Sequence, residues 1–126
     1  MAITIIPIGK TNPTNPDAPM LYYPKATKTG EIDLEELSEQ IAYSSSLTQA
    51  DCYAVIISLV ATVSRELDAG KIVRLGNLGA FQISVKGTAS ATPEEITPKN
   101  VRSASVIFRS GKKFKMMLKG LQFVRK

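Results

Sequence analysis

The chain has no histidine and only one cysteine, Cys52, among its 126 residues. Without histidine, hydrolytic triads of the usual type are excluded, and a single thiol cannot build a structural zinc cluster. A lone cysteine also excludes an internal disulfide framework and suits a reducing compartment. Cys52 lies in an apolar segment, where we expect a buried, inert thiol rather than a nucleophile. We therefore predict no enzyme activity, no metal, no cofactor and no small-molecule substrate.

Long apolar runs are missing too. No stretch approaches the roughly 18 apolar residues of a membrane span. Residues 1–9 have no basic segment before their short apolar run, which argues against a secretory signal. We expect a cytoplasmic protein without a membrane partner. One domain with a modest core is the simplest organisation for a chain of this length and ordinary hydrophobic content.

Acidic residues are scarce in the second half of the chain. Residues 1–70 contain four Lys/Arg and nine Asp/Glu, whereas residues 71–126 contain twelve Lys/Arg and only two acids, Glu94 and Glu95. The resulting charges of −5 and +10 indicate that the C-terminal part faces a polyanion. The alternative is a basic surface that is merely solvated.

The first 30 residues are predicted to form an extension ahead of a domain spanning residues 31–126. Residues 2–8 are rich in β-branched side chains and predict a strand, which Pro7 confines to a sheet edge or ends. Three prolines within residues 13–19 predict an extended loop. Residues 20–23 predict a second short strand, stopped by Pro24.

Two helices are predicted to follow. Asp33 and Glu36, and then Thr48 and Asp51, have the spacing of N-terminal capping boxes. Three serines separate the two helices, and Gly70 supplies the stop after the second one.

The second helix is apolar nearly all round. Between residues 50 and 63 only Asp51, Ser58 and Thr62 are polar, whereas a surface helix needs a single apolar stripe. We expect a second subunit to cover part of this helix. The alternative is a central core helix within a monomer.

A glycine-bounded turn follows the helices. Residues 71–75 and 80–85 alternate in polarity on either side of it, and Gly76 and Asn77 tolerate the positive φ that a hairpin turn requires. Residues 101–108 alternate again and predict a returning strand. A short basic helix is expected over residues 112–118, followed by a last apolar segment at residues 121–124.

Four segments, taken in order, resemble the HU and integration host factor family of bacterial DNA-architectural proteins. They are the helical pair from Asp33 to Asp51, the junction Leu67-Asp68-Ala69-Gly70-Lys71-Ile72-Val73, the turn Leu78-Gly79-Ala80-Phe81, similar to the family's G-F-G-T-F, and the segment Phe108-Arg109-Ser110-Gly111-Lys112-Lys113-Phe114-Lys115, similar to its F-K-A-G-K-x-L-K. The resemblance covers residues 32–119. It implies an α+β fold with two N-terminal helices, a three-stranded antiparallel sheet carrying a β-arm, and a C-terminal helix. Two such chains would form an intertwined homodimer.

The function that this resemblance implies is non-specific binding of duplex DNA by a histone-like protein of the bacterial nucleoid, with bending of the DNA. Arg109, Lys112 and Lys115 match basic positions of the family, and Lys86 matches one at the root of the arm. The predicted DNA-binding residues are these four and their basic neighbours: Arg74, Lys86, Lys99, Arg102, Arg109, Lys112, Lys113 and Lys115.

The arm, residues 86–102, departs from the family pattern. It is shorter, has three basic residues, and lacks the arginine-flanked R-N-P-x-T-G tip. Pro93 is the candidate wedge for the minor groove, but Glu94 and Glu95 follow it and repel phosphates. The alternative role of Pro93 is that of a structural turn proline. The chain thus resembles an N-terminally extended variant with a reduced arm.

Two other functions are compatible with these patterns. The first is an HU-fold module for protein interaction or structure, with weak or no DNA bending, which the reduced arm and the N-terminal strands favour. The second is RNA binding, with Tyr22 and Tyr23 stacking on bases beside Lys25, although tyrosines in this position also serve as packing residues.

Overall fold

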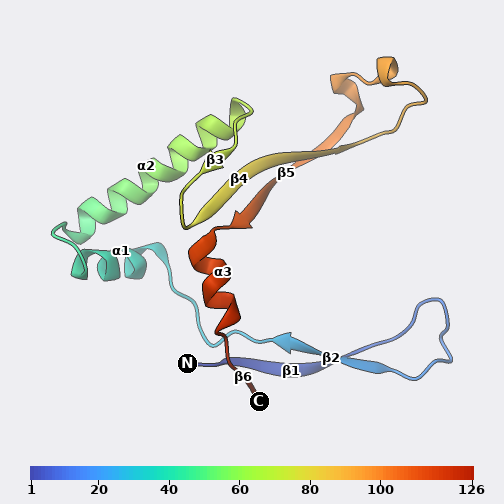
Figure 1. Cartoon of the computed structure of the whole chain (residues 1–126), viewed down its shortest axis with the longest axis horizontal. Helices are drawn as coiled ribbons and strands as arrows, with labels where there is room; N and C mark the ends of the chain where they lie inside the picture. The colour runs from blue at the N-terminus through green and yellow to red at the C-terminus, as the bar shows by residue number, and fades with distance from the viewer.

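The computed structural model describes all 126 residues and contains three α-helices and two three-stranded sheets (Figure 1). The α+β class and the order of elements agree with the prediction. In chain order the elements are β1 (Ile3–Lys10), β2 (Leu21–Ala26), α1 (Leu34–Tyr43), α2 (Gln49–Asp68), β3 (Val73–Arg74), β4 (Gly79–Gly87), the 3-10 turns η1 (Pro93–Glu95) and η2 (Pro98–Asn100), β5 (Val101–Ser110), α3 (Lys112–Lys119) and β6 (Phe123–Arg125). None of the helices combines the length and hydropathy that a membrane span requires.

Both predicted helix starts are confirmed. The Asp33 carboxylate accepts a hydrogen bond of 2.9 Å from the backbone N–H of Glu36, and the Thr48 hydroxyl accepts one of 3.1 Å from that of Asp51. Each bond satisfies a donor that the first helical turn would otherwise leave unpaired. Gly70, at φ 84°, reverses the chain after α2 as expected.

The sheet β3-β4-β5 is antiparallel and has two chemically different faces. The register places Val73 opposite Phe81 and Phe81 opposite Phe108, whereas Arg74 lies opposite Ala80 and Ala80 opposite Arg109. Because side chains alternate between the faces of a sheet, one face is apolar and the other polar. The apolar face carries Val73, Phe81, Ile83, Val85, Val106 and Phe108. The polar face carries Arg74, Gln82, Ser84, Lys86, Ser103, Ser105 and Arg109, together with Ala80 and Ile107.

The turn between β3 and β4 is tied to the end of β5. Gly76 and Gly79 adopt φ values of 56° and 143°. Asn77 does not have the positive φ that the sequence suggested, because the two glycines provide the reversal. The N–H of Leu75 donates to the carbonyl of Gly79 over 2.8 Å, and the N–H of Gly111 donates to the carbonyl of Leu78 over 3.0 Å.

The N-terminal sheet has the strand order β2-β1-β6, which corrects two expectations about its prolines. Strand β1 is central rather than at an edge, yet Pro7 is tolerated because β6 pairs only with Ile3 to Ile5. Pro24 does not stop β2 but lies within it, opposite Pro7. Two residues without N–H groups can face each other where an antiparallel ladder makes no hydrogen bond between the opposed pair.

Strand β6 joins the two ends of the chain. It runs parallel to β1, with Ile3 opposite Phe123, and the backbone N–H of Ile3 donates to the Gln122 carbonyl over 2.8 Å. The sequence indicated an apolar segment here, but no local pattern identifies a partner strand more than 100 residues away. The division into residues 1–30 and 31–126 remains a prediction, and the pairing adds a direct contact between these two parts.

A single chain has very little core. Only four of its 126 residues are buried. Apolar residues of α2 and of the sheet line an open groove of about 370 Å³, including Leu59, Val60, Val63 and Phe81. Val60 remains 63% exposed although it lies in the middle of the most apolar helix.

The contact between the turn and β5 gives a first prediction. Replacement Gly79→Ala adds a methyl group at positive φ that would collide with the Arg109 carbonyl and lie 2.8 Å from the Phe108 ring. We expect a loss of about 2–4 kcal/mol in the free energy of unfolding, measured by urea denaturation at fixed protein concentration. Gly30→Ala is the matched control, because no atom lies within 4 Å of the added methyl. Equal stability of the two variants would contradict this role of Gly79.

Candidate nucleic-acid interface

Three of the predicted basic residues surround one hollow. Arg74, Arg109 and Lys115 line it together with Ala80 and the glycines 76, 79 and 111, and its volume is about 330 Å³. Arg74 and Arg109 stand on the same face because Ala80 pairs with both of them across the three strands. Two strand spacings separate their backbones by about 10 Å. The small side chain of Ala80 leaves the space between them open.

Glycine at position 111 positions the third cation. A side chain there would collide with the backbone carbonyl of Asn77. The close approach lets the junction between β5 and α3 rest on the hairpin turn, so that α3 begins beside the two arginines. Helix α3 then starts at Lys112, with the first helical hydrogen bond running from the N–H of Lys115 to the carbonyl of Gly111 over 3.1 Å.

The start of α3 is electrostatically unusual. Its cap, Gly111, has no side chain to accept hydrogen bonds from the first turn, and that turn contains no acidic residue. Instead it contains Lys112, Lys113 and Lys115. The positive end of the helix dipole and unpaired N–H groups also lie here, so these cations are intrinsically unfavourable at this end. An anion bound at this end would offset both costs.

The cations of the hollow have no acidic partner within the chain. The two ion pairs of the structure are Lys28–Glu31 at 3.0 Å and Lys71–Glu66 at 2.8 Å. The hydrogen bond from Lys71, together with its charge, lowers the pKa of Glu66 from its ordinary value. Lys71 is therefore neutralised locally, whereas Arg74, Arg109 and Lys115 remain available to a ligand.

The other predicted residues are more dispersed. Lys86 lies on the polar face, opposite Ser103, where the sheet leads into the arm. Arg102 is the extra residue of a β-bulge between the pairs Lys86–Ser103 and Gly87–Val101. Lys99 belongs to η2 at the tip of the arm. The sequence did not single out Ala80, since its place between two arginines follows from the register of three strands.

The tip of the arm is a folded cap. Asn100 organises it: its side-chain oxygen accepts from the Thr97 N–H at 2.8 Å, and its amide nitrogen donates to the Thr88 hydroxyl at 3.0 Å. Pro93 is the first residue of η1 and is exposed, with Glu94 and Glu95 exposed beside it. The structure thus places Pro93 at the surface of the tip, next to both carboxylates.

Comparison with known proteins identifies the family and the fold. Residues 1–125 match the family described as an HU domain fused to a wHTH, Ig or glycine-rich motif. No curated protein matches the sequence. A solved structure of a proposed DNA-binding protein from Bacteroides vulgatus superposes with a TM-score of 0.69 at 15% identity, covering 98% of this chain and 47% of that one. The present chain thus spans about half the length of that protein.

A second solved structure is that of Anabaena HU crystallised with DNA. It superposes with a TM-score of 0.54 at 21% identity, covering 71% of this chain and 99% of the HU chain. At these identities both likenesses show the fold.

The uncapped start of α3 leads to a prediction about stability. Lys112→Glu places a carboxylate at the positive end of the helix, so we expect the free energy of unfolding to rise by about 0.3–1 kcal/mol in low-salt buffer without multivalent anions. Lys119→Glu makes the same change in charge at the other end of α3 and should lower it by a similar amount. Urea denaturation followed by circular dichroism measures both. Destabilisation of the same size in both variants would show that the dipole plays no part.

Proposed function

Since the chain belongs to the family of HU domains fused to wHTH, Ig or glycine-rich motifs, we propose that it binds duplex DNA non-specifically, as a homodimer, within the bacterial nucleoid. The observation that supports DNA binding most directly is the hollow formed by Arg74, Arg109 and Lys115 beside the uncapped start of α3. Each of its features suits a phosphate group: forked guanidinium donors, an ammonium group and free backbone N–H groups.

This site reads charge rather than sequence. Arginine forks bind two phosphate oxygens and lysine acts as a point charge, and neither interaction depends on the bases. The polar face continues from Arg109 through Ser105 and Ser103 to Lys86, so a phosphate backbone can follow the sheet toward the arm. Lys112 and Lys113 extend the same positive region along α3.

The homodimer is proposed from the exposure of α2. In one chain the groove between α2 and the sheet stays open, and its lining is almost entirely apolar. Exposed apolar surface of this extent marks an interface. A second copy that placed its own α2 and sheet against this groove would complete the core that one chain lacks. A second copy of the same chain then accounts for the apolar residues all round α2, and no different protein is needed to cover them.

Bending is assigned to the arm, with Pro93 as the wedge. The exposed position of Pro93 supports contact with DNA, whereas Glu94 and Glu95 weaken it by repulsion from phosphates. We therefore propose that most of the affinity comes from the sheet and α3, and that the arm adds a smaller, shape-dependent contribution.

DNA binding is tested by its dependence on salt. If about six phosphates are neutralised, the logarithm of the affinity should fall with the logarithm of salt concentration with a slope of roughly −5. In a homodimer the triple variant Arg74→Gln, Arg109→Gln, Lys115→Gln removes six cations, so the slope should lose most of its steepness, about 5. The control Lys28→Gln, Lys71→Gln removes two cations that already pair with Glu31 and Glu66, and it should leave the slope nearly unchanged.

Fluorescence anisotropy with labelled duplex DNA, single-stranded DNA and RNA makes this measurement. Absence of binding to the duplex at low salt would contradict the proposal and favour a protein-interaction module. Tighter binding to RNA than to duplex DNA would favour the RNA-binding alternative.

The dimer is tested by mass. Sedimentation equilibrium at micromolar concentration should give twice the chain mass of 13.7 kDa. Val60→Asp should shift the population toward monomer, because Val60 is 63% exposed in one chain and a charge there is costly only when a partner covers it. Val101→Asp, at a residue 47% exposed at the start of β5, is the control. A monomeric wild-type protein would contradict the homodimer.

A further inference from the structure

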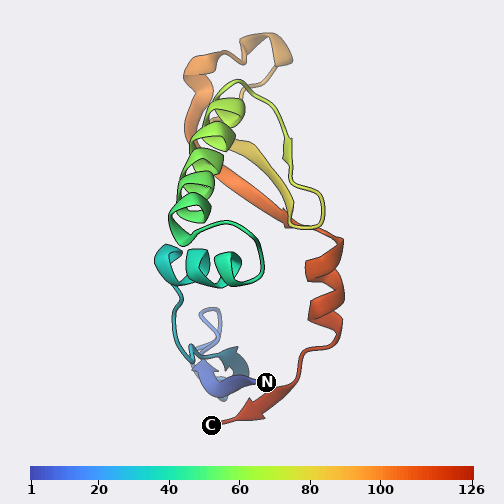
Figure 2. The same ribbon diagram turned by 90° about the vertical axis from the view of Figure 1, so that its left-hand side faces the viewer.

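The N-terminal sheet has apolar residues on both faces and little to pack against. Its main contacts are those of its strands with one another. Segments 27–33 and 120–122 connect it to α1 and α3, and Figures 1 and 2 show it set apart from the helices and from the other sheet. Tyr22 is 67% exposed and Phe123 is 58% exposed. A sheet with two apolar faces normally packs against another layer.

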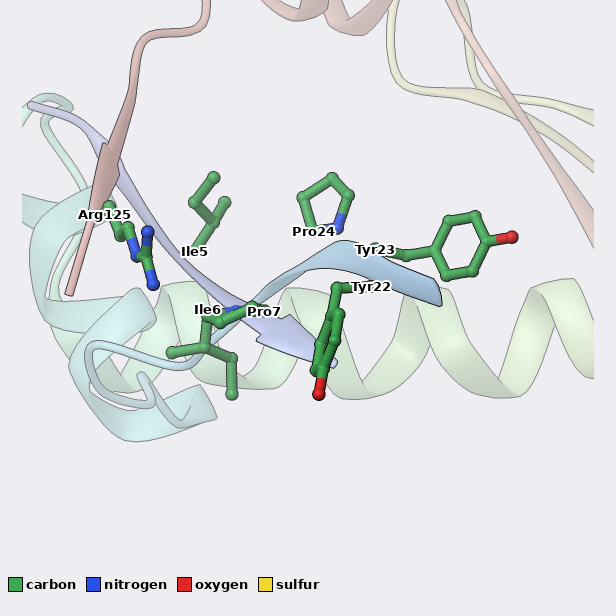
Figure 3. A pocket seen from close by; sticks show the side chains of 7 residues that line it. All are labelled: Ile5, Ile6, Pro7, Tyr22, Tyr23, Pro24 and Arg125. Atoms are coloured by element: carbon green, nitrogen blue, oxygen red, sulfur yellow. The ribbon is translucent and has the colours of Figure 1, made fainter. Parts of the chain in front are cut away.

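One part of this sheet is hollowed. The hollow measures about 190 Å³ and is lined by Ile5, Ile6, Pro7, Tyr22, Tyr23, Pro24 and Arg125. Figure 3 shows the guanidinium of Arg125 at one end and the two tyrosines at the other, with isoleucine and proline side chains between them. Arg125 pairs with Ile5 and shares its face, whereas Ile6 points to the opposite face, so residues of both faces line this hollow.

The charges of the sheet have the same sign. The ionisable side chains of β1, β2 and β6, apart from the two tyrosines, are Lys10, Lys25 and Arg125, and no acid occurs in these strands. None of the three cations has an ion-pair partner within the chain. Lys10 and Lys25 lie on the same face of the sheet, because Lys25 pairs with Ile6, whereas Arg125 pairs with Ile5 and lies on the opposite face.

The complementary surface occurs elsewhere in the same sequence. Residues 29–64 contain six acids and no lysine or arginine. Helix α1 carries three of the acids, Glu35, Glu36 and Glu39, all exposed and without an ion-pair partner. The same helix exposes apolar groups, among them Tyr43, which is 90% exposed at its end.

We propose that the N-terminal sheet of one copy docks on α1 of a second copy through the face that carries Lys10 and Lys25, with these two cations facing the acids of the helix. This inference rests on the proposed homodimer and adds a second contact to it, outside the groove of α2. In a twofold dimer the contact occurs twice, because each copy offers one sheet and one α1. A protein partner is favoured over a nucleic acid because the face with Lys10 and Lys25 otherwise carries mainly apolar side chains, among them Ile6, Ile8 and Leu21.

Charge exchange between copies tests the contact. The sheet variant carries Lys10→Glu and Lys25→Glu, and the helix variant carries Glu35→Lys, Glu36→Lys and Glu39→Lys. Each variant alone brings like charges together in its homodimer, so its dissociation constant should rise roughly tenfold at low salt. When the two are mixed, each contact of the heterodimer joins opposite charges. The mixture should therefore regain wild-type affinity and contain mainly heterodimers, measured by native mass spectrometry after equilibration.

Mixing also separates contact between copies from contact within one chain. If each sheet met its own α1, both chains of the heterodimer would still carry like charges, and mixing would rescue nothing. The variant Glu94→Lys, Glu95→Lys serves as a control: mixed with the sheet variant, it should form heterodimers only in the statistical proportion.

The outcomes are distinguishable from failure of the proposed function. A monomeric wild-type protein would remove both the homodimer and this contact. A wild-type dimer whose two variants show no preference for each other would overturn the contact and leave the α2 interface standing. A sheet variant that loses DNA affinity and dimerises normally would also overturn it, since the sheet would then be a nucleic-acid surface.

Discussion

The close approach of the hairpin turn to the junction of β5 and α3 is the constraint on which the interface depends. Gly111 donates to the Leu78 carbonyl over 3.0 Å, and neither Gly79 nor Gly111 has room for a side chain. This contact fixes where α3 begins relative to the sheet. Without it, Lys115 would have no defined position beside Arg74 and Arg109, and three separate cations would replace one hollow.

The junction that this contact fixes is also the start of α3, where the charges of the first turn are unfavourable for the helix. A helix that opens with three lysines and no cap loses stability at its positive end, and a capping acid there would raise it. That choice of residues is consistent with a surface whose stability is completed by a bound polyanion. The opposite pattern at α1 and α2 makes the point clear, because both of those helices begin with a side-chain cap and acids in the first turn.

The sequence was a good guide wherever structure depends on neighbouring residues. The caps at Asp33 and Thr48, the reversal at Gly76 and the returning strand follow from local spacing, and the structure contains all of them. Features that depend on the pairing of distant strands could not be predicted from the sequence. The parallel strand β6, the central position of β1 with Pro7, and the lateral row of Arg74, Ala80 and Arg109 need a register that links remote segments.

One chain buries few residues and leaves two apolar surfaces open to solvent. Four buried residues offset little of the conformational entropy that an ordered backbone loses on folding. Two apolar surfaces remain open, the groove of α2 and the N-terminal sheet, and they lie on different parts of the molecule. Covering only the groove would complete the core around α2 and leave the sheet with two exposed apolar faces. Strand β6 follows α3 after only residues 120–122, so we expect a partner that covers the sheet also to restrain the helix whose first turn faces the proposed phosphate site. Assembly and DNA binding are therefore expected to be coupled through α3, with each favouring the ordered position of the other.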